Sequence, residues 1–175
     1  GVGVDGASFL RKVNKALKNN NKHMFVLLGN HDNYDKYGKA SHSQVFPGTR
    51  TFQEASNIHF FERQAWFTMN NMRFLAVCGA NSINRNNLSH KDEKIGGIKY
   101  LKSWWSEEQI TDTDVANAVS GGEADILLCH DAPTQGFPLT EEEANVGREM
   151  WSGAGVAYAE ISGEQLQKVL EAVKP

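Results

Sequence analysis

Two short apolar runs in this sequence end in histidine-bearing tetrapeptides. The run at 24–28 is followed by Gly-Asn-His-Asp, and the run at 126–129 is followed by His-Asp-Ala-Pro. An asparagine oxygen with imidazole nitrogens suits a borderline cation such as Mn²⁺, Fe²⁺ or Zn²⁺, and an imidazole also donates a proton near neutral pH. Asn30, His31 and His130 are therefore candidates for a metal site with a general acid beside it.

Each of these histidines also has an ordinary structural explanation, because a single histidine after a strand is more often a turn residue than a ligand. Two His-Asp pairs at matching positions shift the balance toward a site. Four further histidines lack partners at ligand spacing and are expected at the surface or in turns. They are His23, His42, His59 and His90.

The two apolar runs read as strands that must position these residues. Short runs rich in Val, Ile and Leu are typical of strands buried on both faces of a parallel sheet in an α/β domain. Ligands bind at the carboxyl ends of such strands. We therefore expect the two tetrapeptides to lie side by side. The remaining pattern predicts a helix at 5–19 with Phe9 on its apolar face, a strand at 58–61 and a hairpin over 65–77 that turns at Asn70-Asn71.

The second half of the chain alternates in the same way. Residues 81–99 are polar and aperiodic, which predicts a long surface loop, and helices are expected at 113–119 and 163–173. Capping-box spacing occurs in the tetrapeptides that begin at Ser106, Thr140 and Ser162 and favours a helix start at each. With 175 residues and no repeat or linker, the chain fits one domain.

Composition excludes several classes of protein. A net charge of −3 gives no general drive toward nucleic acid, and no apolar run approaches the length of a membrane span. The two cysteines, Cys78 and Cys129, each end an apolar run and are expected to be buried reduced thiols. This use of cysteine favours a cytoplasmic location.

The motif Gly-Asn-His-Asp at 29–32, with a lone histidine far downstream at 129–133, resembles the calcineurin-like metallophosphoesterase family. The expected hairpin and the His-Asp-Ala-Pro loop occur in the order that this family uses. Ser-Trp-Trp-Ser-Glu-Glu at 103–108 is similar to a bacterial and phage branch of the family. The resemblance covers the chain from about Phe9 to Val173.

The resemblance implies an α/β four-layer sandwich, two mixed β-sheets flanked by helices, which would be incomplete in this chain. It also implies a metal-dependent hydrolase of phosphate esters, a phosphatase in which two divalent cations (Mn, Fe or Zn) activate a water for in-line attack. Asn30 and His130 would ligate the second metal, and His31 would protonate the leaving alkoxide. Asp32 and Asp131 would orient their loops without binding metal.

Two further features are weighed against this background. Arg85 lies just past a strand end, where its guanidinium could meet a phosphate oxygen, although a solvated loop arginine is the more ordinary interpretation. The pair Trp104-Trp105 could form an aromatic wall over the site, but it is more often a packing element.

The family's Asp-x-His, Gly-Asp and Gly-His-x-His motifs do not occur in this sequence. We therefore expect residues 1–175 to be the central part of a single metallophosphoesterase domain, with weak or partial metal binding and little hydrolysis. Two alternatives stay open: a phosphodiesterase or nuclease of the same family, and a non-catalytic α/β binding module. The expected partner is a phosphate ester, whether a small molecule, a phosphoprotein or a nucleotide, with nucleic acid only for a nuclease and no membrane.

Overall fold

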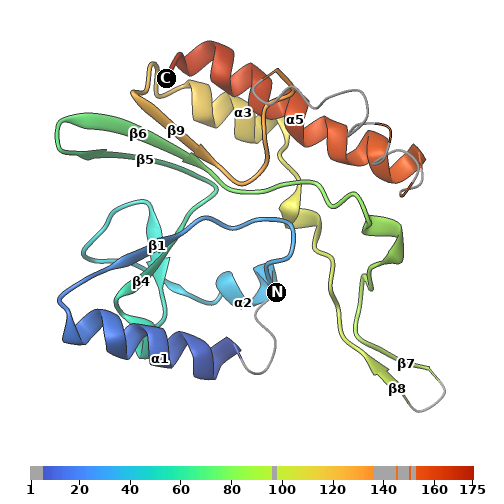
Figure 1. Cartoon of the computed structure of the whole chain (residues 1–175), viewed down its shortest axis with the longest axis horizontal. Coiled ribbons are helices and arrows are strands. Elements are labelled where there is room, and N and C mark those ends of the chain that lie inside the picture. Colours follow the sequence, from blue (N-terminus) through green and yellow to red (C-terminus); the bar gives the residue numbers. More distant parts are fainter. Residues whose placement is uncertain (1–5, 96–97, 136–144, 146–149, 151–152) are drawn as a thin grey trace.

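Two β-sheets lie face to face between helices, which gives four layers in the order helix, sheet, sheet, helix (Figure 1). The computed structural model describes residues 6–95, 98–135, 145, 150 and 153–175. Helix α1 covers the outer side of one sheet, and α3 and α5 cover the outer side of the other. Because each sheet contains both parallel and antiparallel pairs, the α/β fold class predicted from the sequence is confirmed.

The first sheet has the strand order β1-β4-β3-β2. β1 pairs with β4 in parallel, whereas the other pairs are antiparallel. β1 is an edge strand among the described residues, and the chain passes directly from it into the Gly-Asn-His-Asp loop. The elements of this half are β1 (Met24–Val26), α2 (Tyr34–Tyr37), β2 (Ser41–His42), β3 (Thr49–Thr51), the 3₁₀ helix η1 (Gln53–Ala55) and β4 (Ile58–Phe61).

The second sheet has the order β5-β6-β9 and carries the predicted hairpin. β5 (Gln64–Met69) and β6 (Met72–Val77) are joined by Asn70 and Asn71, whose φ angles of 53° and 62° are those that a two-residue turn requires. β9 (Ile126–Cys129) lies parallel to β6 and leads into His130. Both histidine-bearing loops therefore follow parallel strands, one in each sheet.

Helix α1 (Gly6–Asn19) packs on the first sheet through a partly polar face. Leu10 and Asn14 are buried, and the Asn14 Oδ1 accepts a hydrogen bond of 2.8 Å from the Asn57 backbone N–H. The side chain of Phe9 is 61% exposed, so its predicted place on the buried face was wrong. A buried asparagine is stable in this position because its amide bonds the connection before β4.

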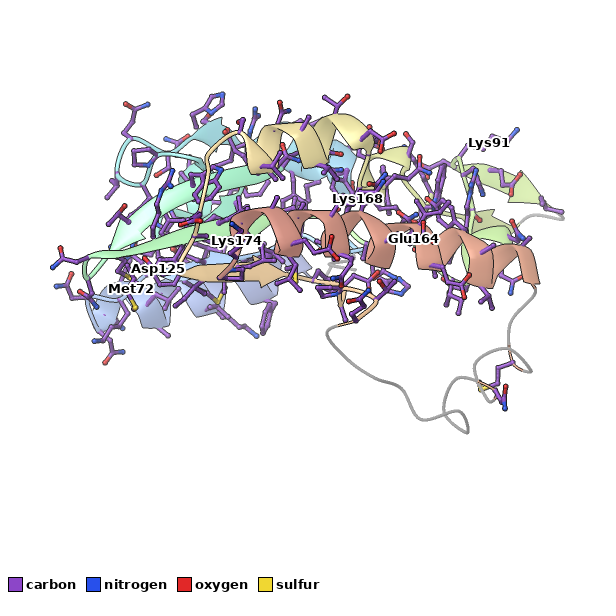
Figure 2. All side chains as sticks on the ribbon, turned by 90° about the horizontal axis from the view of Figure 1, so that it is seen from above. Met72, Lys91, Asp125, Glu164, Lys168 and Lys174 are labelled. Atoms are coloured by element: carbon purple, nitrogen blue, oxygen red, sulfur yellow. The ribbon has the colours of Figure 1, made fainter. Side chains whose placement is uncertain are left out.

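Helices α3 (Asp112–Val119) and α5 (Gly153–Val173) pack on one face of the second sheet. Thr111 and Asp114 form a reciprocal capping box at the start of α3. Figure 2 looks down on α5, whose polar side is exposed to solvent. The buried members of this core are Leu75, Val77, Ile110, Ala118, Ala124, Leu166, Val169 and Val173.

Two of the predicted helix starts are wrong. Ser106 begins only the 3₁₀ helix η3 (Ser106–Glu108), which has no side-chain cap and in which Glu108 is fully buried. Ser162 lies in the middle of α5, where its hydroxyl donates to Asp131 across the domain. The third capping box, at 140–143, lies outside the described residues. For Ser162, a contact with a residue 31 positions away determines the orientation of a side chain that the local pattern assigned to a cap.

The segment predicted as a surface loop at 81–99 is also more ordered than expected. It contains the 3₁₀ helix η2 (Arg85–Asn87) and ends in a hairpin of β7 (Glu93–Ile95) and β8 (Ile98–Tyr100). Asn81 is 4% exposed and Ser82 is fully buried. The segment therefore begins inside the molecule and ends in an arm that projects from it (Figure 1).

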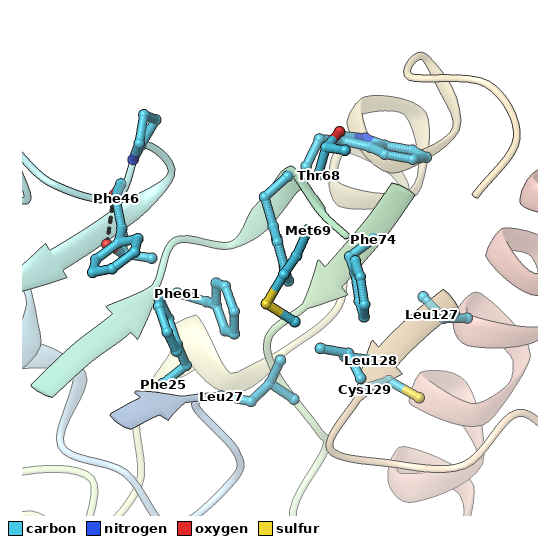
Figure 3. A pocket seen from close by; sticks show the side chains of 14 residues that line it. Phe25, Leu27, Phe46, Phe61, Thr68, Met69, Phe74, Leu127, Leu128 and Cys129 are labelled. Carbon is cyan, nitrogen blue, oxygen red and sulfur yellow. Dashed lines mark hydrogen bonds between the residues drawn. The ribbon is translucent and has the colours of Figure 1, made fainter. Parts of the chain in front are cut away.

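An apolar cleft of about 980 Å³ lies between the two sheets (Figure 3). Phe25, Phe61 and Leu27 line it from the first sheet and its continuation, and Phe74 and Leu128 line it from the second. The strands β1 and β9 lie beside the cleft and are edge strands among the described residues. Across the described helices, no segment is both long and apolar enough to cross a membrane.

His59 is the exception among the four histidines expected at the surface or in turns. Its side chain is 1% exposed in β4, and its Nε2 lies 2.9 Å from the Nδ1 of His23. Burial, and then the neighbouring His23, lower the pKa of His59. This pair could not be predicted from the sequence, because the two residues meet only through the parallel register of β1 and β4.

Candidate active site

The structure brings the two histidine-bearing loops into direct contact. A Cβ placed on Gly29 would lie 2.4 Å from the Nε2 and Cε1 atoms of His130, so the imidazole rests on the bare backbone of Gly29. Any larger residue at position 29 would force the ring to move. Asn30 follows Gly29 in the chain, so its backbone lies next to this contact.

The Gly29–Asp32 loop is held by hydrogen bonds to its own backbone. The Gly29 N–H donates to the Asp32 Oδ2 at 2.8 Å, and the Tyr34 hydroxyl donates to the Gly29 carbonyl at 3.0 Å. Burial raises the pKa of Tyr34, which keeps the phenol protonated and able to donate. Asn33 caps α2 by accepting from the Lys36 N–H at 2.9 Å. These contacts fix the backbone and leave the exposed His31 side chain free to meet a ligand.

The His130 loop is held in a comparable way by Asp131. Its Oδ1 accepts from the Ala132 N–H at 2.9 Å, and its Oδ2 accepts from the Ser162 hydroxyl of α5. Both aspartates of the two His-Asp pairs thus bond to protein groups in their own surroundings. His130 itself is exposed.

A buried carboxylate supports the site from behind. The fully buried Glu108 accepts from the Ser82 N–H and hydroxyl, each at 2.7 Å, from the Trp104 Nε1–H at 2.9 Å and from the Tyr158 hydroxyl at 3.3 Å. Burial, and then the charge of Glu108, raise the pKa of Tyr158 to about 12. The Ser82 hydroxyl also lies 3.4 Å from the Asn30 carbonyl oxygen. Glu108 therefore connects three segments behind the Asn30 loop.

Arg85 is held between two aromatic rings. Its guanidinium carbon lies 4.7 Å from the ring centroid of Trp104 and 4.6 Å from that of Tyr158. No carboxylate forms an ion pair with Arg85 among the residues that the structure describes. Cation–π contacts stabilise the guanidinium without neutralising its charge. Arg85 is thus neither a freely solvated loop residue nor part of a salt bridge.

Two residues of this region, Glu108 and Tyr158, were not predicted from the sequence. The capping-box spacing pairs Ser106 with Gln109 and gives Glu108 no role, and nothing local marks Tyr158. The only available signal was an acidic residue shortly after two tryptophans, since an indole N–H needs an acceptor when it is buried.

The donors at the two strand ends fit one side of a metal's coordination shell. An amide oxygen from Asn30 and an imidazole nitrogen from His130 are of the types that borderline divalent cations accept. Within the described ranges, no cluster of three or more His, Cys, Asp or Glu residues completes such a shell. The fit is therefore partial.

The comparison with protein families agrees with this geometry. The family model of the calcineurin-like phosphoesterases matches residues 4–162, and the chain belongs to this family. The family hydrolyses phosphate esters and binds divalent metals, which places the contact between Gly29 and His130 in a metallohydrolase fold. No curated protein and no solved structure matches the chain.

Proposed function

We propose that this chain provides part or all of the catalytic centre of a metal-dependent phosphatase, built from Asn30, His31 and His130. The observation that carries the proposal is the contact of the His130 ring with the Gly29 backbone, which brings both strand-end loops to one place. Because the chain belongs to the phosphoesterase family, we interpret this contact as part of a site that hydrolyses phosphate esters.

In this proposal Asn30 and His130 hold one divalent cation through the amide oxygen and an imidazole nitrogen. When bound, a pair of cations, Mn or Fe with Zn, would supply the positive charge that polarises the ester and its attacking water. Asp32 and Asp131 keep the two loops in position, since their carboxylates bond the Gly29 N–H and the Ser162 hydroxyl.

His31 acts as the general acid. Its imidazole is exposed at the loop beside Asn30 and has no hydrogen-bond partner among the described residues. An imidazolium there donates its proton to the leaving oxygen as the P–O bond breaks, and so no alkoxide is released. Arg85 binds a phosphate oxygen, because its charge is presented between two rings without a carboxylate.

A phosphodiesterase or nuclease of the same family is the second candidate, and a metal-free binding module is the third. A cytoplasmic location is part of the proposal. It is supported by the free thiols of Cys78 and Cys129, whose pKa values are raised by burial.

Release of nitrophenol from nitrophenyl phosphate in Mn²⁺ tests the function. The chain should release product slowly, because its described residues complete only part of a coordination shell, and it should lose this activity in a chelator and regain it with added metal. His42→Ala, which changes an exposed histidine of β2, is the control and should keep the activity. Absence of metal-dependent release would refute the hydrolase, and preference for a bis-nitrophenyl diester would favour the second candidate.

A further inference from the structure

A groove of about 640 Å³ with a mixed polar and apolar lining opens beside His31. Its walls come from the start of α2 and from the two segments that flank the β7–β8 hairpin. Lys91, which lies on the hairpin side of the molecule in Figure 2, belongs to one of these segments. The lining residues that matter here are His31, Asn33, Asp35, His90, Lys91 and Asp92.

Hydrogen bonds fix the walls of the groove. Asp35 Oδ2 accepts from the Trp105 Nε1–H at 2.8 Å and from the Lys102 Nζ at 3.0 Å. The Lys102 backbone N–H in turn donates to the Asp92 Oδ1 at 2.7 Å. The two strands of chain that enter and leave the hairpin are thereby joined to α2, so the groove is a built feature of the fold.

The groove also adjoins the proposed phosphate contact. The ring of His90 lies 4.4 Å, centroid to centroid, from that of Trp104, and the Arg85 guanidinium packs on the same Trp104 ring. One tryptophan therefore contacts both a lining residue of the groove and the cation proposed to bind phosphate.

The two lysines and the two carboxylates of the groove balance one another, which leaves the proton of His31 as its net charge, and its unpaired polar atoms include both donors and acceptors. Lys91 and Lys102 balance Asp35 and Asp92. The Asn33 Nδ2, the His90 ring nitrogens and the Lys91 Nζ have no hydrogen-bond partner among the described residues, and neither does the Asp92 Oδ2. A ligand that fills this groove must offer both donors and acceptors, because a buried unpaired polar group is unfavourable.

We infer that this groove binds the leaving group of the phosphate ester, and that this group is an uncharged, hydroxyl-rich alcohol such as a sugar. The inference rests on the proposed function for the position of the phosphoryl group. Each hydroxyl both donates and accepts, which matches the mixed lining. An alkyl or aryl alcohol would leave that lining unpaired, and a polyanion would place negative charges beside Asp35 and Asp92.

Two esters that share a six-membered ring and a primary phosphate test the inference. One is glucose carrying phosphate on its primary hydroxyl, and the other is cyclohexylmethyl phosphate, which keeps the ring and lacks the hydroxyls. Phosphate release in Mn²⁺ and the amide NMR shifts of Asn33, Asp92 and Lys102 are measured with each ester. The sugar ester should be preferred by about tenfold or more in kcat/KM, the size expected when polar groups lose their partners.

Variants locate the preference in the groove. Lys91→Gln and Asp92→Asn each unbalance its charge and should reduce the preference, and the double variant should recover part of it. Lys15→Gln, on the exposed side of α1, is the matched control and should leave it unchanged.

The possible outcomes distinguish a failure of the groove inference from a failure of the proposed hydrolase function. Hydrolysis of both esters at equal rates, or shifts outside the groove, overturns the inference and leaves the hydrolase standing. Groove shifts for the sugar ester alone, without hydrolysis of either, support the groove and refute the hydrolase. Tighter occupation of the groove by a short oligonucleotide than by the sugar ester overturns the inference as well, as does the absence of any shift.

Discussion

At the scale of single residues, the contact between Gly29 and His130 is the structural basis of the site. Since a Cβ at position 29 would meet only the end of an exposed side chain, Gly29→Ala can be accommodated if the imidazole turns away. The variant should keep its free energy of unfolding within about 1 kcal/mol and lose about tenfold in Mn²⁺ affinity. Calorimetric titration measures the second quantity.

The matched control is Gly153→Ala, because a Cβ at Gly153 meets nothing within 4 Å. Its Mn²⁺ affinity should equal that of the unchanged chain. Equal affinities for Gly29→Ala and the unchanged chain would show that His130 does not bind the cation from its present position.

The buried His59, whose Nε2 lies 2.9 Å from the Nδ1 of the exposed His23, makes stability depend on pH. The folded chain holds the pKa of His59 below the ordinary value of 6.5, so the unfolded chain takes up a proton at a higher pH than the folded one. The stabilisation from the neutral ring is complete above pH 6.5 and is lost as the pH falls from there through the lower folded pKa. Urea unfolding at a series of pH values measures it.

His59→Gln should remove this slope, whereas His42→Gln should keep it because His42 is exposed. Asp114 causes a second loss of stability at lower pH. Its hydrogen bonds to Arg63 and Thr111 lower its pKa to about 2. This stabilisation is present above 3.8 and disappears as the pH falls toward 2. A profile without any change between pH 6.5 and 3.8 would argue against the His59 assignment.

At the scale of elements, Glu108 holds together the segment after β6, the tryptophan pair and α5. Replacing it by alanine leaves four buried donors without their acceptor. We expect Glu108→Ala to lower the free energy of unfolding by about 3 kcal/mol, measured in urea. Glu108→Gln should lose less because its amide oxygen still accepts.

The neighbouring Glu107 provides the comparison, since its side chain is exposed. Glu107→Ala should change stability by about 0.5 kcal/mol or less. Similar losses for both alanine variants would mean that the Glu108 contacts contribute little.

Elements that depend on neighbouring residues were predicted well from the sequence. The Asn70-Asn71 turn, the strand Ile58–Phe61 and the helix from Gly6 to Asn19 all arise from local periodicity and from the φ preferences of asparagine. The β7–β8 hairpin was missed because each of its strands has only three residues, too short to show an alternating pattern.

The residues of the candidate site differ in the same way in how far they can be predicted from the sequence. Asn30, His31 and His130 could be chosen from the sequence because each follows a recognisable strand. Glu108 and Tyr158 could not be chosen in this way, because their roles depend on distant partners. Glu108 lies 26 residues from Ser82 and 50 residues from Tyr158 in the chain. Only the folded molecule brings such partners together.

At the scale of the whole molecule, the cleft between the sheets exposes apolar side chains that a closed core would bury. Met69 lines it and is 52% exposed. The folded chain should therefore bind an apolar dye such as anilinonaphthalene sulfonate and keep a native near-ultraviolet circular dichroism spectrum, unlike a molten globule. Met69→Lys should weaken dye binding without loss of stability. Dye binding that is unchanged by this substitution would place the dye elsewhere.

The central claim is that one metal centre lies between the two strand ends, with His130 as a ligand and His31 as the acid. Line broadening by Mn²⁺ in NMR spectra of the unchanged chain, His31→Ala and His130→Ala tests it most directly. We predict that Mn²⁺ broadens the Asn30 signals first in the unchanged chain and in His31→Ala, and that this broadening is lost in His130→Ala. Equal broadening in both variants, or broadening confined to surface carboxylates far from Asn30, would contradict the claim.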